Sequence, residues 1–166
     1  MNATAQDSRP SPSCSASPGS RGIGNPAGGQ DNARAMSQEN LEIVSRAIAA
    51  INDRDVDAYL ALCSPDVELI NTVAAIEGPY RGEAGIRNFF QAIDEGATRF
   101  ELEVKRLQPL DDNRVLGSLT LVLETERGYR DRQALTNLYE LEGGKLLRVR
   151  VFADHAEALE AAGLSE

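Results

Sequence analysis

The sequence predicts an α+β fold in which a curved antiparallel or mixed sheet wraps around three N-terminal helices. Apolar residues recur at helical spacing in three segments between residues 36 and 93. From Phe100 onward, apolar and polar residues alternate in four runs that are separated by turn residues. The helices must cover the apolar face of this sheet, and a concave sheet under three helices leaves a cone-shaped internal pocket.

The composition of the chain changes near residue 36. Residues 1–35 contain six Ser, five Gly and four Pro, with Ile23 as the only large aliphatic side chain. Such a segment buries too little apolar surface to offset its ordering entropy. We therefore expect a disordered N-terminal extension over residues 1–35 and one folded domain over residues 36–166, with Met36 as its natural beginning.

Charge and composition argue against several classes of function. The formal net charge of −9 repels the phosphates of a nucleic acid, and no apolar run approaches the roughly 18 residues that span a bilayer. Two cysteines, Cys14 and Cys63, do not make a disulfide framework, which fits a cytoplasmic protein. No cofactor motif and no cluster of metal ligands is visible, since Asp111-Asp112 is typical of a turn. The sequence thus predicts no nucleic acid, membrane, metal or cofactor partner.

The first helix is expected to start at Ser37, which is a good N-cap residue. Its apolar positions are Leu41, Val44, Ile48 and Ile51. Residues 52–55 end this helix, and Asp55 is placed to cap a short second helix before Ser64-Pro65. The apolar stripe of the second helix is Val56, Tyr59, Leu60 and Cys63, so Cys63 is interpreted as a core residue rather than a nucleophile.

A strand over residues 66–71, "DVELIN", leads to the corner "GPYRG". A phosphate-binding loop would need a Lys-Ser/Thr pair after the glycines, and Glu83 stands there instead. Tyr80 is either a residue on the rim of the pocket or part of a simple turn. The third helix begins at Gly82, and its apolar face is Ile86, Phe89, Phe90 and Ile93.

The second half of the domain is predicted to form four strands, followed by a short terminal helix over residues 154–164. Gly143-Gly144 supplies the positive backbone angles of the last hairpin turn. The strand patterns are "FELEVKRLQ", "RVLGSLTLVLET", "RDRQALTNLYEL" and "KLLRVRVF".

Three blocks resemble the SnoaL-like branch of the nuclear transport factor 2-like superfamily, over roughly residues 36–164. They are "MSQENLEIVSRAIAAINDRDVDAYLALCSPDVEL", "GPYRGEAGIRNFF" and "EGGKLLRVRVFADHAEALEAAGL". This superfamily includes polyketide cyclases, ketosteroid isomerases, epoxide hydrolases and many proteins without an assigned role. The resemblance implies the cone-shaped fold with its pocket, and it leaves the activity open.

The catalytic groups of two such enzymes are missing at the corresponding positions. The proton-abstracting carboxylate of ketosteroid isomerases follows the equivalent of Val67-Glu68, where this chain has Leu69. Strand alternation turns Glu68 to the other side from Leu69. The epoxide hydrolases resemble this chain at Arg132, but the acid expected two residues later is replaced by Ala134.

The candidate ligand-binding residues are Asn71, Tyr80, Arg132 and Asp154, which would orient a molecule in an apolar pocket. Asp154 with His155 is also the candidate catalytic pair, and the alternative for His155 is a solvated residue at the start of a helix. The alternation does not show which set of alternate residues, the one with Arg132 or the other, points into the pocket.

A homodimer is expected, because the strand over residues 130–141 has apolar residues on both faces and a partner subunit would cover one of them. Arg148 and Arg150 share one face of the last strand, where Glu140 or Glu142 can pair with them. The leading hypothesis is a domain that binds a small hydrophobic molecule. The alternatives are a cyclase, isomerase or hydrolase of such molecules, and a homodimeric association module without a ligand.

Overall fold

The structure is a computed structural model that describes residues 20–71 and 78–164. The chain divides into two compact units, Met1–Met36 and Ser37–Glu166, and each is described by itself. The N-terminal extension expected over residues 1–35 falls in the first unit, and its disorder stays a prediction. In the described part of the chain, no helix combines the length and the apolar character needed to cross a bilayer.

Helix α1 comprises Ser20–Asn52, so Ser37 lies inside it and the prediction that Ser37 caps it is wrong. Residues 33–36 are Ala, Arg, Ala and Met, which are strong helix formers, and they let the helical backbone continue through Ser37. In the second unit the predicted apolar positions Val44, Ile48 and Ile51 are buried.

Helix α2 (Val56–Ala61) begins as predicted, because the Asp55 carboxylate accepts a hydrogen bond from the Ala58 amide at 3.1 Å. The prediction that Cys63 lies on this helix is wrong, since Cys63 is the first residue of strand β1 (Cys63–Ile70). Pro65 forces the residue before it into extended backbone, so the strand starts early. Cys63 is nevertheless a core residue, and its thiol donates to the Tyr59 carbonyl at 3.2 Å.

One six-stranded mixed sheet forms the centre of the second unit, with the strand order β2-β1-β6-β5-β4-β3. Strands β1 and β6 are parallel, and the other neighbouring strands are antiparallel. The four strands predicted from alternation are confirmed. The remaining strands are β2 (Tyr80–Arg81), β3 (Arg99–Asp111), β4 (Arg114–Glu124), β5 (Arg130–Glu142) and β6 (Lys145–Phe152).

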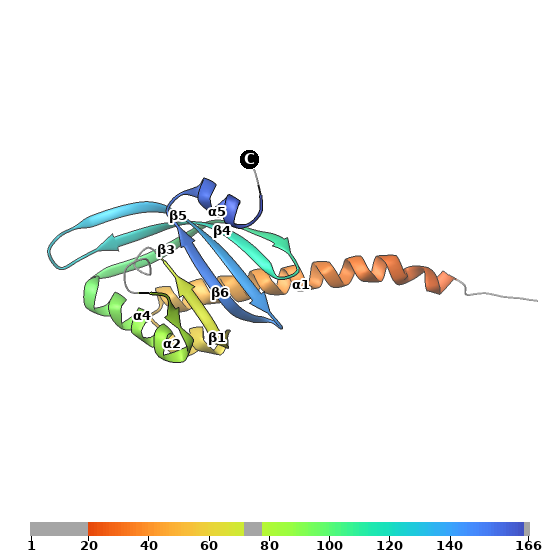
Figure 1. Cartoon of the computed structure of the whole chain (residues 1–166), viewed down its shortest axis with the longest axis horizontal. Coiled ribbons are helices and arrows are strands. Elements are labelled where there is room, and N and C mark those ends of the chain that lie inside the picture. The colour runs from red at the N-terminus through yellow and green to blue at the C-terminus, as the bar shows by residue number, and fades with distance from the viewer. Residues whose placement is uncertain (1–19, 72–77, 165–166) are drawn as a thin grey trace, which may run out of the picture. The chain divides into compact units, whose positions relative to one another are not determined.

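Helix α4 (Gly82–Gly96) begins at Gly82 as predicted and buries its predicted apolar face. Together with α2 it lies on one side of the sheet, while the short helix α5 (His155–Ala161) lies on the other side (Figure 1). We call the side that packs on α1, α2 and α4 the helix face. Its buried side chains include Val67, Leu69, Leu102, Val115, Leu119, Leu135, Tyr139 and Val149.

The opposite side of the sheet, here the outer face, is covered in part by α5 of the same chain. Leu116 and Leu138 on this face are buried against Ala158 and Ala162. At this place the second apolar face of β5 is therefore covered by α5 of the same chain. A partner subunit was expected there from the sequence. Ala158 on α5 and Ala162 at its C-cap leave little side-chain bulk between this segment and the sheet, which permits the close contact.

Candidate functional site

A cavity of about 230 Å³ opens at one end of the helix face, where α4 passes over the start of β3 and the end of β4. Most of its wall is aliphatic or aromatic. The lining residues are Asn71, Tyr80, Phe89, Ala92, Ile93, Gly96, Ala97, Phe100 and Leu123. The amide of Asn71 and the hydroxyl of Tyr80 are the polar groups in this set.

The position of Tyr80 on the rim depends on a close contact between α4 and β2. A Cβ atom added to Gly85 would lie 2.7 Å from the carbonyl carbon of Tyr80. Leu69 pairs with Tyr80 across β1 and β2, and the Tyr80 ring meets the Phe89 ring at 5.5 Å between centroids. Tyr80 was interpreted either as a residue on the rim of the pocket or as part of a simple turn. In the structure Tyr80 lines the cavity. Residues 72–77, which precede this corner, lie outside the described residues.

Asn71 reaches the same cavity because it follows β1 with the parity of Val67 and Leu69. Both of these residues are buried on the helix face. Glu68 has the opposite parity and bonds to Arg81 at 2.8 Å and to Arg148 at 3.1 Å. The alternation inferred for this strand is thus confirmed, and it places Glu68 on the outer face.

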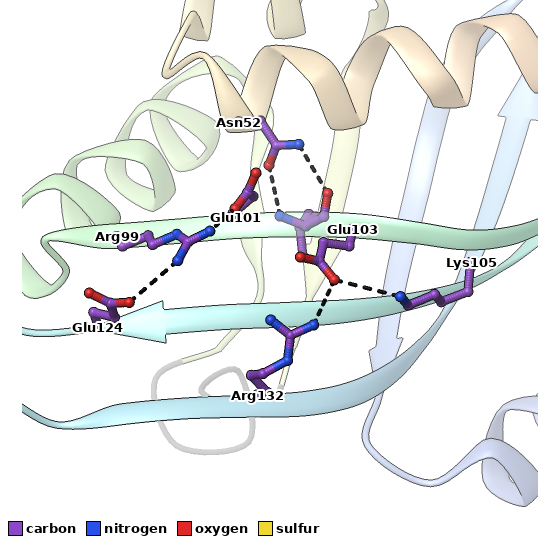
Figure 2. A network of polar contacts seen from close by, with 8 residues as sticks. Asn52, Arg99, Glu101, Glu103, Lys105, Glu124 and Arg132 are labelled. Carbon is purple, nitrogen blue, oxygen red and sulfur yellow. Dashed lines mark hydrogen bonds and ion pairs between the residues drawn. The ribbon is translucent and has the colours of Figure 1, made fainter.

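Arg132 lies apart from this cavity, on the outer face of β5. Its guanidinium bonds to Glu103 at 2.8 Å, and Lys105 approaches the same carboxylate at 3.6 Å (Figure 2). The hydrogen bond from Arg132 is the main reason that the pKa of Glu103 lies below its ordinary value. The Arg132 side chain is 58% exposed, so its position is that of a solvated cross-strand ion pair.

Asp154 and His155 also lie on the outer face, at the start of α5. The Asp154 carboxylate caps this helix, accepting from the amides of Ala156 at 2.8 Å and Glu157 at 3.4 Å. Nδ1 of His155 lies 3.0 Å from the hydroxyl of Thr136. Of the predicted site residues, the structure brings together Asn71 and Tyr80, and it places Arg132, Asp154 and His155 elsewhere.

The ladder predicted for the last strand is confirmed on the outer face. The carboxylate of Glu140 lies 2.9 Å from Arg150 and 3.7 Å from Arg148. Arg148 also contacts Glu68, so the ladder continues across β6 into β1. These half-buried ion pairs give the uncovered part of the outer face a polar surface of mixed charge.

Burial shifts the pKa of two titratable side chains in the core. Burial is the main reason that the pKa of the Cys63 thiol rises to about 12, and Lys145 opposes this rise. Burial also raises the pKa of Tyr139 to about 12, against a lowering hydrogen bond from Asn137. At neutral pH these groups are uncharged, which supports the interpretation of Cys63 as a core residue.

A second hollow, of about 670 Å³, adjoins the first cavity and shares Phe100 and Ala97 with it. Charged residues dominate its wall, among them Arg54, Asp94 and Glu101. The side chain of Asn52 holds β3 here, because its amide donates to the Leu102 carbonyl and accepts from the Leu102 amide (Figure 2). In the described part of the chain, no group of three His, Cys, Asp or Glu side chains is placed to hold a metal ion.

Several residues of these two walls were not predicted from the sequence. Ala92, Gly96 and Ala97 have no chemistry that singles them out, although their spacing from Phe89 and Ile93 on α4 was a usable signal. Arg54 was interpreted only as part of a helix end. Arg54 stands just after the helix, at a position where glycine is the usual residue, and this unusual choice was the signal available for it.

The known proteins that resemble this chain share its fold. A structure of TerC co-crystallised with polyporic acid is 22% identical, covers 74% of this chain and 96% of its own, and has a TM-score of 0.63. RV0760c from Mycobacterium tuberculosis, in complex with estradiol-17beta-hemisuccinate, is 17% identical, with coverage of 70% and 95% and a TM-score of 0.63. The epoxide hydrolase/cyclase-like enzyme SalBIII is 21% identical, with coverage of 69% and 90% and a TM-score of 0.60.

These identities are low, so the solved structures show a shared fold and not an activity. A search of curated protein sequences finds no significant match. The profile of the SnoaL-like domain family matches residues 44–149, a range that contains α2, α4 and strands β1 to β5. The chain therefore belongs to the SnoaL-like domain family.

Proposed function

We propose that this SnoaL-like domain binds a small apolar molecule in the cavity between α4 and the β3–β4 hairpin. The observation that carries the proposal is the composition of the wall, in which Phe89, Phe100 and Leu123 face one space together with the single amide of Asn71. Binding sites for small molecules have this character, with an apolar surface for affinity and few polar groups for orientation.

The size of the cavity sets the size of the ligand. An apolar cavity of roughly 150 Å³ holds benzene. The cavity here measures about 230 Å³ and is open at Ala92 and Gly96, which are both exposed residues. It therefore suits a molecule with one or two rings inside the wall, and a longer ligand would extend past α4 into solvent.

Two of the similar structures support a ligand of this class, because TerC was crystallised with polyporic acid and RV0760c with estradiol-17beta-hemisuccinate. We propose binding and no reaction. Leu69, whose side chain takes up no proton, stands where an isomerase base is expected, and the candidate pair Asp154 and His155 lies on the outer face. The homodimer and the cytoplasmic location stay predictions.

Filling the mouth of the cavity is expected to abolish binding. In the variant Ala92→Trp, the indole occupies the space between α4 and Phe100, so the affinity for the neutral fluorescent probe N-phenylnaphthylamine falls by about tenfold or more. Ala92 is exposed, so the fold is retained. A fluorescence titration measures the affinity, and circular dichroism checks the fold.

The matched control is Gln91→Trp, on the same helix at an exposed position that does not line the cavity. Its affinity for the probe should equal that of the wild type. Equal binding by both variants, or no binding by the wild type, would refute the cavity as the binding site.

A further inference from the structure

Arg54 has a backbone conformation that arginine seldom adopts. It follows α1 with a φ angle of 58°, and among the described non-glycine residues it is the one with a positive φ. The amides of Arg54 and Asp55 bond back to the carbonyls of Ile51 and Ala50, which is the usual end of a helix. Glycine is preferred at this position because it has no Cβ, so the arginine side chain itself is the feature that needs an explanation.

The guanidinium of Arg54 is held above the ring of Phe100, a residue that lines both hollows. Its Cζ lies 5.6 Å from the centroid of the Phe100 ring, and its Nη1 donates to the Ile51 carbonyl at 2.8 Å. Phe100 lines both the apolar cavity and the charged hollow, and Arg54 lines the second of them. A cation is thus fixed one ring away from the apolar cavity.

Arg54 and its neighbour Arg99 differ in how firmly they are paired. Arg99 bonds to Glu101 at 2.6 Å and to Glu124 at 3.4 Å (Figure 2). Arg54 has one carboxylate contact, to Asp94 at 3.4 Å, and the Asp94 side chain is 62% exposed. Among the residues that the structure describes, Nη2 of Arg54 has no hydrogen-bond partner. The side chain is 26% exposed, so an incoming group can reach it.

We propose that Arg54 is the residue that determines ligand specificity, and that it selects apolar molecules carrying an anionic oxygen group. This inference rests on the proposed function. The apolar part of the ligand occupies the cavity beside Phe89 and Phe100, and its anionic group reaches past the Phe100 ring to the guanidinium. Guanidinium N–H groups bind such oxygens by charge-assisted hydrogen bonds, and the ring holds the cation in place.

The carboxylates around the charged hollow repel an anion. Whether an anion binds to Arg54 therefore depends on how strongly Arg54 is paired with Asp94. The Arg54–Asp94 contact is loose and its carboxylate is exposed, so the pair contributes little free energy, and an anion that is partly desolvated against Phe100 competes with it. Removing the charge of Asp94 should therefore strengthen the binding of an anion. Removing the guanidinium of Arg54 should weaken it.

The test compares two fluorescent probes that differ by one anionic group, N-phenylnaphthylamine and anilinonaphthalene sulfonate. We expect Arg54→Gly to reduce the affinity for the sulfonate by about tenfold and to change that for the neutral probe by less than about twofold. Glycine accepts the φ angle of 58°, so this variant keeps the helix end. Asp94→Asn should bind the sulfonate more tightly than the wild type, again with little change for the neutral probe.

Arg127→Ala serves as the control, since Arg127 is an exposed arginine in the turn between β4 and β5 and lines neither hollow. Its ratio of affinities for the two probes should stay that of the wild type. Equal losses for both probes in Arg54→Gly, or an unchanged sulfonate affinity, would overturn the role of Arg54 and leave the binding cavity standing. Failure of the wild type to bind either probe would overturn the cavity and the role of Arg54 together.

Discussion

Replacing Phe90 with alanine is expected to lower the free energy of unfolding by about 3–5 kcal/mol. Phe90 is 4% exposed and projects from α4 toward Tyr59 of α2. It meets the Tyr59 ring at 5.5 Å and the Phe89 ring at 5.8 Å, in edge-to-face arrangements that add to the effect of burial. Small domains have a total stability of about 5–15 kcal/mol, so this one change removes a large share of it.

Unfolding in urea, followed by circular dichroism, measures the effect as a shift of the midpoint. The matched control is Tyr129→Ala, which removes an aromatic side chain that is 54% exposed. This variant should stay within about 0.5 kcal/mol of the wild type. If the two variants lost equal stability, α4 would not be packed on the core as described.

A single methyl group at Gly85 is expected to destabilise the protein by about 1–3 kcal/mol. Alanine is normally the better helix residue by about 1 kcal/mol, so the local preference alone predicts the opposite sign. The added Cβ would lie 2.7 Å from the carbonyl carbon of Tyr80 and 3.1 Å from its Cα atom. Because both are backbone atoms, β2 must move away from α4, and Tyr80 moves with it on the rim of the cavity.

Gly96→Ala is the control for this prediction, since it lies on the same helix and a Cβ there would meet no atom within 4 Å. We expect it to be neutral or slightly stabilising, in line with helix propensity. Urea unfolding of both variants gives the comparison. A Gly85→Ala variant as stable as Gly96→Ala would contradict the close approach of α4 to β2.

Periodicity predicted most of the fold because the core is built from regular patterns. The apolar face of α4 and the four strands after Phe100 follow spacing rules that depend only on neighbouring residues. The starts of elements were less predictable. Helix α1 continues through Ser37, and β1 begins at Cys63, because propensity upstream and a proline downstream outweigh a single capping or apolar residue.

The candidate site was predictable only where alternation fixes the direction of a side chain. Asn71 shares the parity of Val67 and Leu69, and the structure places it in the cavity wall. For Arg132 the alternation left two directions open, since β5 is apolar on both faces. Its direction depends on the register with β4, in which Val122 and Arg132 are paired. Such a register is a property of the assembled sheet, and one sequence does not contain it.

The charged hollow was not predictable, because it depends on contacts between distant segments. Arg54 and Phe100 are far apart in the sequence, and only the return of β3 beside the end of α1 brings them together. The outer face shows the same limit. Its apolar residues suggested a partner subunit, whereas α5 of the same chain covers Leu116 and Leu138.

A crystal structure of the protein with bound N-phenylnaphthylamine would show whether a small molecule occupies the cavity between α4 and the β3–β4 hairpin. We predict that the rings of the probe contact Phe89, Phe100 and Leu123, with Asn71 at the edge of the site. A cavity closed by its own side chains, with the probe bound elsewhere on the protein, would contradict the proposal.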